Sequence, residues 1–333
     1  MAGVPKFLRL LALVAAALLV VALAACGSGE DEGAGEDASP PVARPADFPD
    51  PKGKTLEQLR SELGPGGPVL APSVSLLEAG GENRLGFGLF ERSRKQITQA
   101  RTALYVSDRR GQTVRGPYPA EFKSLDVEEP FRSDSVKSDP DSAESLYVAD
   151  VPFEKSGDYV VLAALELDGR LVAADPAAVR VVKDANTPDI GEQAPSVSTP
   201  TTGEVKDLAE IDTRVPPSPD LHEDDLADVI GKKPVVLLFA TPALCQSRVC
   251  GPVVDIMKQV KEAHSDEDIS WIHMEIFKDN EFDKGFREQV LAWKLPTEPW
   301  LFTIGADGKV AARLEGAFGE DELEEAVTAA TKN

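Results

Sequence analysis

An uninterrupted apolar stretch, Val235 to Ala240, constrains the fold of this chain more than any other feature. It contains only Val, Leu, Phe and Ala, as expected for a central strand buried on both faces. A helix is predicted next, from Pro252 to His264, because its apolar residues recur at helical spacing and proline suits a first helical position. Strand and helix signals then alternate to the C-terminus in the order β-α-β-α-β-β-α. The later elements are a strand at Ile269–Phe277, a helix face of Phe282, Phe286, Val290 and Trp293, a hairpin of Trp300–Ile304 and Val310–Leu314, and a helix at Glu320–Ala330.

Two of the three cysteines, Cys245 and Cys250, follow the apolar strand within a short distance. A disulfide needs Cα atoms about 4.4–6.8 Å apart. Residues i and i+5 of one helix differ by ~7.5 Å in rise and ~140° in rotation. The two cysteines can therefore pair only if one of them lies in the loop before the helix, which the helix start at Pro252 allows. Three cysteines exclude a disulfide-dense scaffold and a four-cysteine zinc site, and three histidines argue against a His-rich metal centre.

The order of elements resembles the thioredoxin fold over about residues 205–333. The resemblance also rests on a cysteine one loop after the buried strand, a second cysteine at the start of the next helix, and Pro299 directly before the strand Trp300–Ile304. In the family this last place is held by a cis-proline that faces the redox cysteines. Pro296 is the competing candidate, but it lies further from the strand. The resemblance implies thiol–disulfide exchange with Cys245, Cys250 and Pro299 as the catalytic site.

The chain departs from the family pattern in two ways. The family motif is C-x-x-C, whereas this chain has C-x4-C, and the strand position Leu238 lacks the buried acid that many thioredoxins place near there. Distance from the strand favours Cys245 as the attacking thiol. The string from Cys250 to Val253 instead resembles Cys-Gly-Pro-Cys with its last cysteine replaced, and a helix N-terminus stabilises a thiolate. Arg248 between the cysteines is expected to lower either pKa. We expect Cys245 to attack and Cys250 to resolve.

Two other interpretations of the cysteine pair stay open. The pair can be a static structural disulfide, which is natural in an exported domain. The loop also resembles that of Sco-type copper chaperones, which bind Cu(I) with two cysteines and a distant histidine, and soft thiolates suit Cu(I). None of His222, His264 and His273 clearly occupies the late loop where that family keeps its histidine. We expect His264 at a helix end and His273 as a packed or surface strand residue. The exchange interpretation needs no metal or organic cofactor.

The N-terminus predicts the compartment. Residues 10–25 are all Leu, Ala or Val after Lys6 and Arg9, and these sixteen residues are fewer than the ~20 that a membrane-spanning helix needs. The run ends in Leu23-Ala24-Ala25-Cys26, which resembles the bacterial lipobox. The resemblance implies cleavage after Ala25 and lipid on Cys26, and hence a chain anchored on the extracytoplasmic face of the cell membrane. A plain signal peptide or a short uncleaved anchor are the alternatives, and each still exports the chain.

The remaining chain divides by composition. Residues 1–25 are predicted to be the lipoprotein signal peptide, 26–66 a flexible acidic tether in which Thr55–Leu63 can form a short helix, 185–205 a linker and 206–333 the thioredoxin-like domain. Between them, residues 67–184 carry short strand candidates without convincing helices, and Asp168-Gly169 between two apolar runs is a strong hairpin signal. This pattern predicts an all-β sandwich with an immunoglobulin-like outline. The predicted fold class is therefore an α/β thioredoxin-like C-terminal domain preceded by an immunoglobulin-like β-sandwich.

The charge of the chain limits its partners. There are 57 acidic residues against 35 basic ones, a formal charge of −22, which argues against nucleic-acid binding. The sequence predicts a membrane-anchored extracytoplasmic thiol–disulfide oxidoreductase acting through Cys245 and Cys250. Its expected partners are exported proteins with thiols or disulfides, a redox partner, and membrane lipid through Cys26. A Sco-type copper-binding protein and a non-catalytic binding lipoprotein with a structural disulfide are the alternatives.

Overall fold

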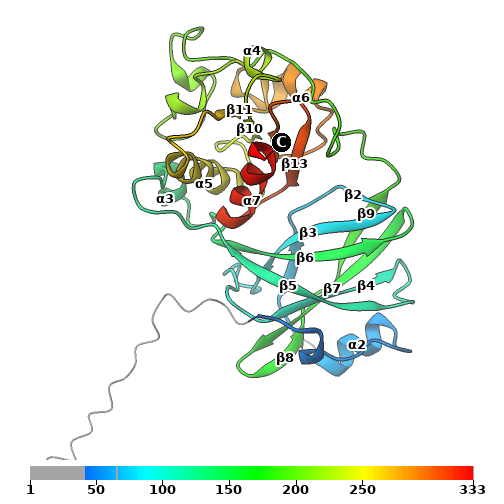
Figure 1. Cartoon of the computed structure of the whole chain (residues 1–333). Coiled ribbons are helices and arrows are strands. Elements are labelled where there is room, and N and C mark those ends of the chain that lie inside the picture. Colours follow the sequence, from blue (N-terminus) through cyan, green and yellow to red (C-terminus); the bar gives the residue numbers. More distant parts are fainter. Residues whose placement is uncertain (1–41, 65–66, 333) are drawn as a thin grey trace, which may run out of the picture. The chain divides into compact units, whose positions relative to one another are not determined.

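Figure 1 shows a computed structural model of the chain, which describes residues 42–64 and 67–332. The predicted signal peptide 1–25, the lipobox-like segment Leu23–Cys26 and the first part of the predicted tether lie outside these residues. From residue 42 onward the chain belongs to one compact unit. Within the described ranges, no helix combines the length and apolar character that a membrane crossing needs.

The C-terminal domain is built on a four-stranded mixed sheet in the order β11-β10-β12-β13. The central strand β10 pairs in parallel with β11 and antiparallel with β12, which pairs antiparallel with β13. This is the arrangement of a thioredoxin-like fold, as predicted. The strands are β10 (Val235–Phe239), β11 (Ser270–Met274), β12 (Trp300–Ile304) and β13 (Val310–Glu315), and the helices are α4 (Leu226–Val229), α5 (Cys250–Ala263), α6 (Glu288–Ala292) and α7 (Glu320–Thr331). Short 3-10 helices lie at η2 (Leu208–Glu210), η3 (Pro219–Leu221), η4 (Lys278–Asn280) and η5 (Phe282–Lys284).

Strand β10 is buried on both faces, as its composition predicts. Val236 and Leu238 pack into a cluster with apolar residues of α5 and α7, while Val235, Leu237 and Phe239 pack on the opposite side with Val290 and Trp293. The first cluster includes Val253, Ile256, Met257 and Val260 from α5 and Leu323, Ala326 and Val327 from α7. Because side chains alternate along a strand, helices on both faces of the sheet account for the uninterrupted apolar run.

The segment before α6 differs from its prediction. Phe282 and Phe286 were expected on one helix face with Val290, but their side chains are 64% and 40% exposed, and α6 begins only at Glu288. Gly285 between the two phenylalanines has a φ of 75°, which ends η5 and turns the chain before α6. The predicted helix from Phe282 to Trp293 is therefore wrong in its first half.

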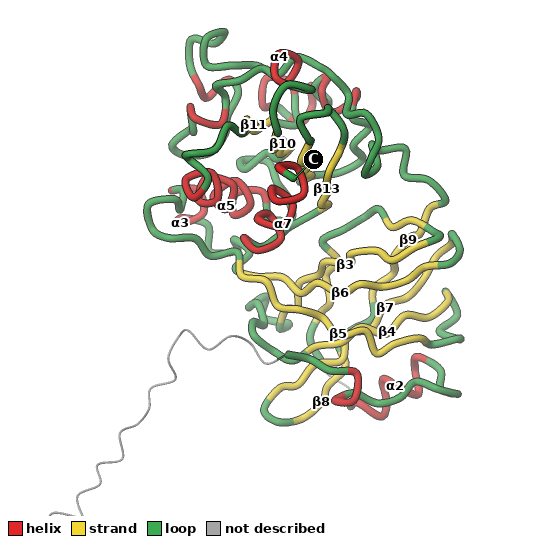
Figure 2. The backbone as a smooth tube through the Cα atoms, in the orientation of Figure 1, coloured by secondary structure: helices red, strands yellow, loops and turns green. Residues whose placement is uncertain are grey.

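Residues 67–184 form an all-β domain; its strands lie among the yellow segments in Figure 2. Its strands are β1 (Val69–Pro72), β2 (Leu77–Glu78), β3 (Gly81–Phe90), β4 (Thr102–Asp108), β5 (Arg115–Ser124), β6 (Ser145–Phe153), β7 (Gly157–Leu167), β8 (Arg170–Ala173) and β9 (Ala177–Val182). A short helix, α3 (Asp134–Ser138), lies between β5 and β6. The first half of β5 pairs with β4 and its second half with β6, so this strand joins two groups of strands. Apolar side chains of both groups, from β3 and β6 and from β4, β7 and β9, share one core.

The predicted hairpin at Asp168-Gly169 joins β7 to β8. The φ values of these two residues are 51° and 71°, which is the conformation that a two-residue type I′ turn requires. Asparagine, aspartate and glycine tolerate this conformation better than other residues do, and the dipeptide therefore predicts the turn.

Residues 42–64 are folded, contrary to the prediction of a flexible tether over 26–66, while the short helix expected at Thr55–Leu63 is confirmed. They contain a 3-10 helix η1 (Pro45–Asp47) and helix α2 (Leu56–Leu63), in which Leu56, Leu59 and Leu63 are buried. These leucines pack with Tyr105 and Leu162 on the face of β4 and β7 that points away from the β-domain core. The acidic, glycine-rich composition of the preceding residues does not extend into this helix.

Residues 185–205, predicted as a linker, run along the C-terminal domain. The amides of Gly191 and Ala194 donate to Val310 and Gly308, at 2.8 and 3.0 Å, and Ala194 is 4% exposed. The segment therefore adds an extended edge to the β12–β13 hairpin. Its Pro, Ser and Thr residues predict irregular structure correctly but give no sign that the backbone is anchored.

Candidate redox site

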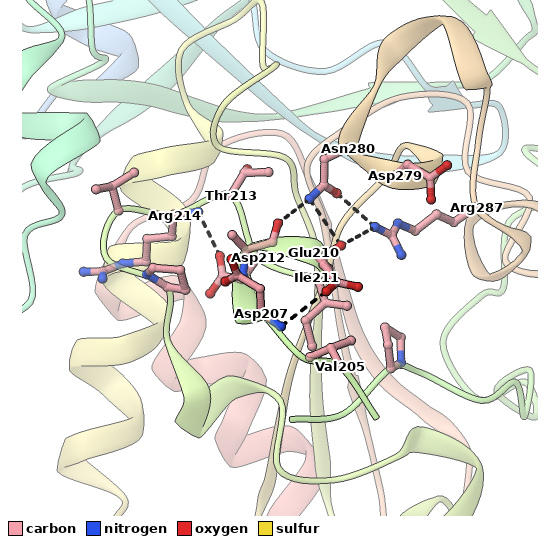
Figure 3. Close-up of a pocket in the computed structure, with 14 residues that line it drawn as sticks. Val205, Asp207, Glu210, Ile211, Asp212, Thr213, Arg214, Asp279, Asn280 and Arg287 are labelled. Atoms are coloured by element: carbon pink, nitrogen blue, oxygen red, sulfur yellow. Dashed lines mark hydrogen bonds between the residues drawn. The ribbon is translucent and has the colours of Figure 1, made fainter. Parts of the chain in front are cut away.

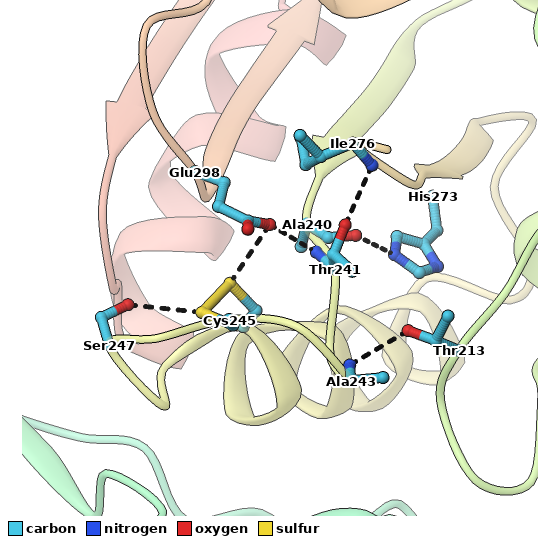
Figure 4. Close-up of a disulfide and its surroundings, with 10 residues drawn as sticks. Thr213, Ala240, Thr241, Ala243, Cys245, Ser247, His273, Ile276 and Glu298 are labelled. Atoms are coloured by element: carbon cyan, nitrogen blue, oxygen red, sulfur yellow. Dashed lines mark hydrogen bonds between the residues drawn. A yellow bond between two sulfur atoms is a disulfide. The ribbon is translucent and has the colours of Figure 1, made fainter. Parts of the chain in front are cut away.

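Cys245 and Cys250 form a disulfide, with their Cα atoms 5.9 Å apart (Figure 4). Cys250 is the first residue of α5, and Cys245 lies in the loop between β10 and this helix. The arrangement agrees with the argument that two cysteines five residues apart pair only when one precedes the helix. The helix begins two residues earlier than Pro252, which lies in its first turn.

The two sulfurs differ in their surroundings. Cys245 is 6% exposed and its Sγ lies 3.3 Å from Ser247 Oγ, whereas Cys250 is fully buried at the start of α5. Since a substrate must reach the attacking sulfur from solvent, Cys245 is the better placed of the two for attack. Cys250, which is fully buried, is placed to attack Cys245 Sγ and resolve a mixed disulfide formed there.

A partly buried carboxyl group lies beside the disulfide. Glu298 Oε2 lies 3.6 Å from Cys250 Sγ and accepts a hydrogen bond of 2.7 Å from the Thr241 amide (Figure 4). Burial raises the pKa of Glu298 to about 7, against the opposing effect of the hydrogen bonds from Thr241. A carboxyl with this pKa exchanges its proton near neutral pH, which suits general acid–base work.

Glu298 supplies the acid that the sequence appeared to lack. The resemblance places this acid within the strand that is β10, near Leu238, but the carboxyl comes from a residue two positions before β12. Sequence reasoning missed it, although its position next to the predicted cis-proline was a usable signal. The Glu298–Pro299 peptide bond is cis, as the resemblance implied, and the cis bonds of the described residues do not include one at Pro296.

Arg248 does not act on the sulfurs as expected. Its guanidinium forms an ion pair with Asp139 at 2.8 Å, and its side chain is 55% exposed. A paired and solvated cation contributes little to the local potential. We therefore assign no part in thiol activation to Arg248.

The three histidines lie away from the disulfide. His264 caps the end of α5, as predicted, and contacts Glu267 and Glu324. His273 is packed inside β11 beside His222, with ring centroids 5.4 Å apart. Of the residues that the structure describes, the one group of three metal-ligand side chains within 4.8 Å of one another is Asp212, His222 and His273. Neither cysteine belongs to it, so the structure assembles no Cys-Cys-His site.

Among known proteins, the chain is similar to solved structures at low sequence identity. No protein-family model matches the chain, and no curated protein matches it. One similar solved structure is assigned as a thiol:disulfide interchange protein DsbE from Chlorobium tepidum. It is 19% identical, with 43% of this chain and 99% of that chain covered and a TM-score of 0.33. Another, a thioredoxin family thiol:disulfide interchange protein from Chlorobium tepidum TLS, is 16% identical, with 44% and 98% covered and a TM-score of 0.30.

A third similar structure, the Lin-41 filamin domain, is 10% identical, with 35% of this chain and 99% of that chain covered and a TM-score of 0.18. These values are too low to assign the chain to a family. The thioredoxin-like fold of the C-terminal domain rests on its own strand order. This domain holds a disulfide between Cys245, 6% exposed, and the fully buried Cys250, whose sulfur lies beside a titratable carboxyl.

Proposed function

We propose that this chain is a thiol–disulfide oxidoreductase that acts through Cys245 and Cys250. The observation that carries the proposal is the contact between Cys250 and Glu298, because a purely structural disulfide needs no neighbouring carboxyl with a pKa near neutral. The thioredoxin-like fold and the greater exposure of Cys245 support the same assignment.

In the reduced protein, the Cys245 thiolate attacks one sulfur of a substrate disulfide. The substrate S–S bond breaks, a mixed disulfide forms, and the other substrate sulfur leaves and takes up a proton. Glu298 then accepts the proton of the Cys250 thiol, and the Cys250 thiolate attacks Cys245 Sγ. The second substrate sulfur leaves, so two electrons have passed to the substrate and the Cys245–Cys250 disulfide has formed. The reverse sequence oxidises a substrate dithiol.

The proposal includes the compartment. The lipobox-like Leu23–Cys26 supports cleavage after Ala25 and a lipid on Cys26, which holds the chain on the extracytoplasmic face of the cell membrane. Exported proteins with thiols or disulfides are then its substrates, and a separate redox partner restores the cysteine pair. The all-β domain, which we propose to be an immunoglobulin-like sandwich, positions the redox domain or docks a partner. The reaction requires no metal or organic cofactor.

The reduction potential of the pair tests the proposal. The full chain in detergent is equilibrated with glutathione buffers and its free thiols are counted. We expect a potential within the range of exchange catalysts, about −120 to −270 mV. A potential below about −300 mV identifies a structural disulfide and overturns the proposal. Thiols that stay reduced and bind Cu(I) instead support the copper alternative.

Serine variants identify the attacking sulfur. Cys250→Ser leaves Cys245 free to attack but removes the resolving thiol, so a mixed disulfide with a model substrate accumulates and is detected by mass spectrometry. Cys245→Ser leaves only a fully buried thiol and is expected to trap much less. If the two variants trap substrate in the opposite order, Cys250 is the attacking thiol.

A further inference from the structure

Three ligand-type side chains that the redox reaction does not use meet inside the C-terminal domain. Asp212 precedes the buried Arg214, His222 ends η3, and His273 lies in β11. The exposed fractions of Asp212, His222 and His273 are 0%, 1% and 1%. One ligand atom from each lies within 4.8 Å of the other two. Two imidazoles and a carboxylate are typical ligands of divalent transition metals.

Three imidazole nitrogens of this cluster lack a hydrogen-bond partner. Eight buried side-chain polar atoms of the described residues have no hydrogen-bond partner, and three of them are His222 Nδ1, His222 Nε2 and His273 Nδ1. A fourth, Ser218 Oγ, belongs to a residue whose amide donates to Asp212. Buried polar groups are nearly always satisfied, and each one that is not costs free energy. The gathering of these unpaired buried atoms in one place indicates that the cluster binds a ligand.

The distances within the cluster fit an ion better than a direct hydrogen bond. His273 Nε2 donates to the Ala240 carbonyl at 2.9 Å, which leaves His273 Nδ1 facing Asp212 Oδ1 at 3.6 Å. His222 Nε2 lies 3.4 Å from Asp212 Oδ2. Charge-assisted N–H···O bonds are shorter, about 2.7–2.9 Å. Two ligand atoms at 2.0–2.1 Å from a tetrahedral zinc ion are about 3.3–3.4 Å apart.

The residues around the cluster hold its ligands in place. The Asp212 carboxylate accepts amide hydrogen bonds of 2.9 Å from Arg214 and 2.7 Å from Ser218. The Ala240 carbonyl fixes the ring of His273 and directs Nδ1 inward. Backbone partners of this kind orient ligands and set the tautomer at metal sites. Glu275, 1% exposed and hydrogen-bonded to the Thr213 amide, places a second carboxyl nearby.

We propose that Asp212, His222 and His273 bind one divalent transition metal ion of the zinc class, with a water as fourth ligand. A surface cavity of about 730 Å³ has Asp212, Thr213 and Arg214 in its wall (Figure 3). The site is separate from the cysteine pair. Its occupancy therefore does not depend on the proposed exchange reaction.

Zinc binding to the full chain tests the proposal. The chain is treated with iodoacetamide to block free thiols while the Cys245–Cys250 disulfide stays closed, and is freed of metal with a chelator. Titration with Zn²⁺ against an indicator is expected to show one equivalent per chain. Co²⁺ in its place is expected to give the visible absorption of a tetrahedral site with nitrogen and oxygen ligands.

Glutamine variants test the ligands. His222→Gln and His273→Gln keep roughly the side-chain volume but remove the imidazole. Loss of a residue that only orients a metal ligand typically weakens metal binding by about 10–100-fold, so loss of a ligand itself is expected to weaken zinc binding by roughly 100-fold or more. His264→Gln is the matched control, because His264 lies outside the cluster at the end of α5. The Cys245→Ser/Cys250→Ser double variant is expected to bind zinc as the wild type does.

Two results overturn the proposal. One is a wild-type chain that binds no stoichiometric Zn²⁺ and gives no tetrahedral Co²⁺ spectrum. The cluster then holds a buried water or a shared proton in place of a metal ion. The other is zinc binding that persists in both glutamine variants or falls equally in His264→Gln. Circular dichroism checks that the variants fold. Where they do not, the wild-type stoichiometry and Co²⁺ spectrum decide.

Discussion

His273 and Glu298 bind opposite ends of one peptide group. His273 Nε2 donates to the Ala240 carbonyl at 2.9 Å, and the amide of the next residue, Thr241, donates to Glu298 Oε2 at 2.7 Å (Figure 4). The same carboxylate oxygen lies 3.6 Å from Cys250 Sγ. The peptide at the end of β10 therefore holds the carboxyl against the inner sulfur, and its other end is fixed from the neighbouring strand β11.

Glu298→Gln is expected to slow resolution of the mixed disulfide by a factor on the order of 10², a typical contribution of general acid–base catalysis. Only the ionised carboxylate accepts the Cys250 proton, and the pKa of Glu298 is about 7. The wild-type rate should therefore rise with pH up to about 7 and then change little. Single-turnover kinetics from pH 5 to 9 measure this. The variant should lose the inflection, and the exposed control Glu288→Gln should keep it; an inflection that survives in Glu298→Gln contradicts the assigned role.

The same substitution is expected to stabilise the oxidised protein at high pH. Burial raises the pKa of Glu298 from 4.5 to about 7, so between these values the folded state holds a proton that the unfolded state has lost. The free energy of unfolding therefore falls as pH rises through this window, by at most about 3 kcal/mol for a partly buried group. Urea unfolding should show Glu298→Gln more stable than the wild type at pH 8 and similar to it near pH 4.5. Equal stability at both values would show that the carboxyl pKa is ordinary.

Arg214→Leu is expected to cost about 3–5 kcal/mol of unfolding free energy, because it leaves a buried carboxylate without its cation. Arg214 Nε lies 2.8 Å from Asp255 Oδ1, and the two side chains are 4% and 1% exposed. The midpoint of urea unfolding measures the loss. Lys284→Ala is the control, since Lys284 pairs with Asp279 and Glu281 at the surface and such pairs contribute about 0–1 kcal/mol. Comparable effects of the two substitutions would contradict the prediction.

Leu59→Ala is expected to destabilise the protein by about 2–5 kcal/mol, the usual cost of removing a buried leucine side chain. Leu59 is fully buried against the β domain, within a segment whose composition suggested a tether. Thermal unfolding measures the effect. Ser61→Ala, on the exposed side of the same helix, should change little. If both variants unfold like the wild type, helix α2 does not contribute to the stability of the domain.

Local patterns predicted the elements of the C-terminal domain well. The apolar run at Val235–Ala240 specified a strand covered on both faces, and the spacing of Cys245 and Cys250 required one of them to precede the helix. Strand β5 escaped prediction because Gly116, Pro117 and Pro119 are poor strand formers, although pairing with two neighbours holds them in extended form. The helix predicted over Phe282–Trp293 failed in its first half, where Gly285 turns the chain.

The sequence by itself determined the strand and helix types and the cysteine pairing geometry, because each depends on residues close together in the chain. The place of the cis-proline followed from the resemblance to the thioredoxin fold. Only the tertiary structure brought Glu298 to Cys250 and gathered Asp212, His222 and His273. The first contact joins residues 48 positions apart, and the cluster joins two loops to strand β11, so no local spacing encodes them. Burial then gives Glu298 its raised pKa, and burial is a property of the packed chain rather than of any residue in it.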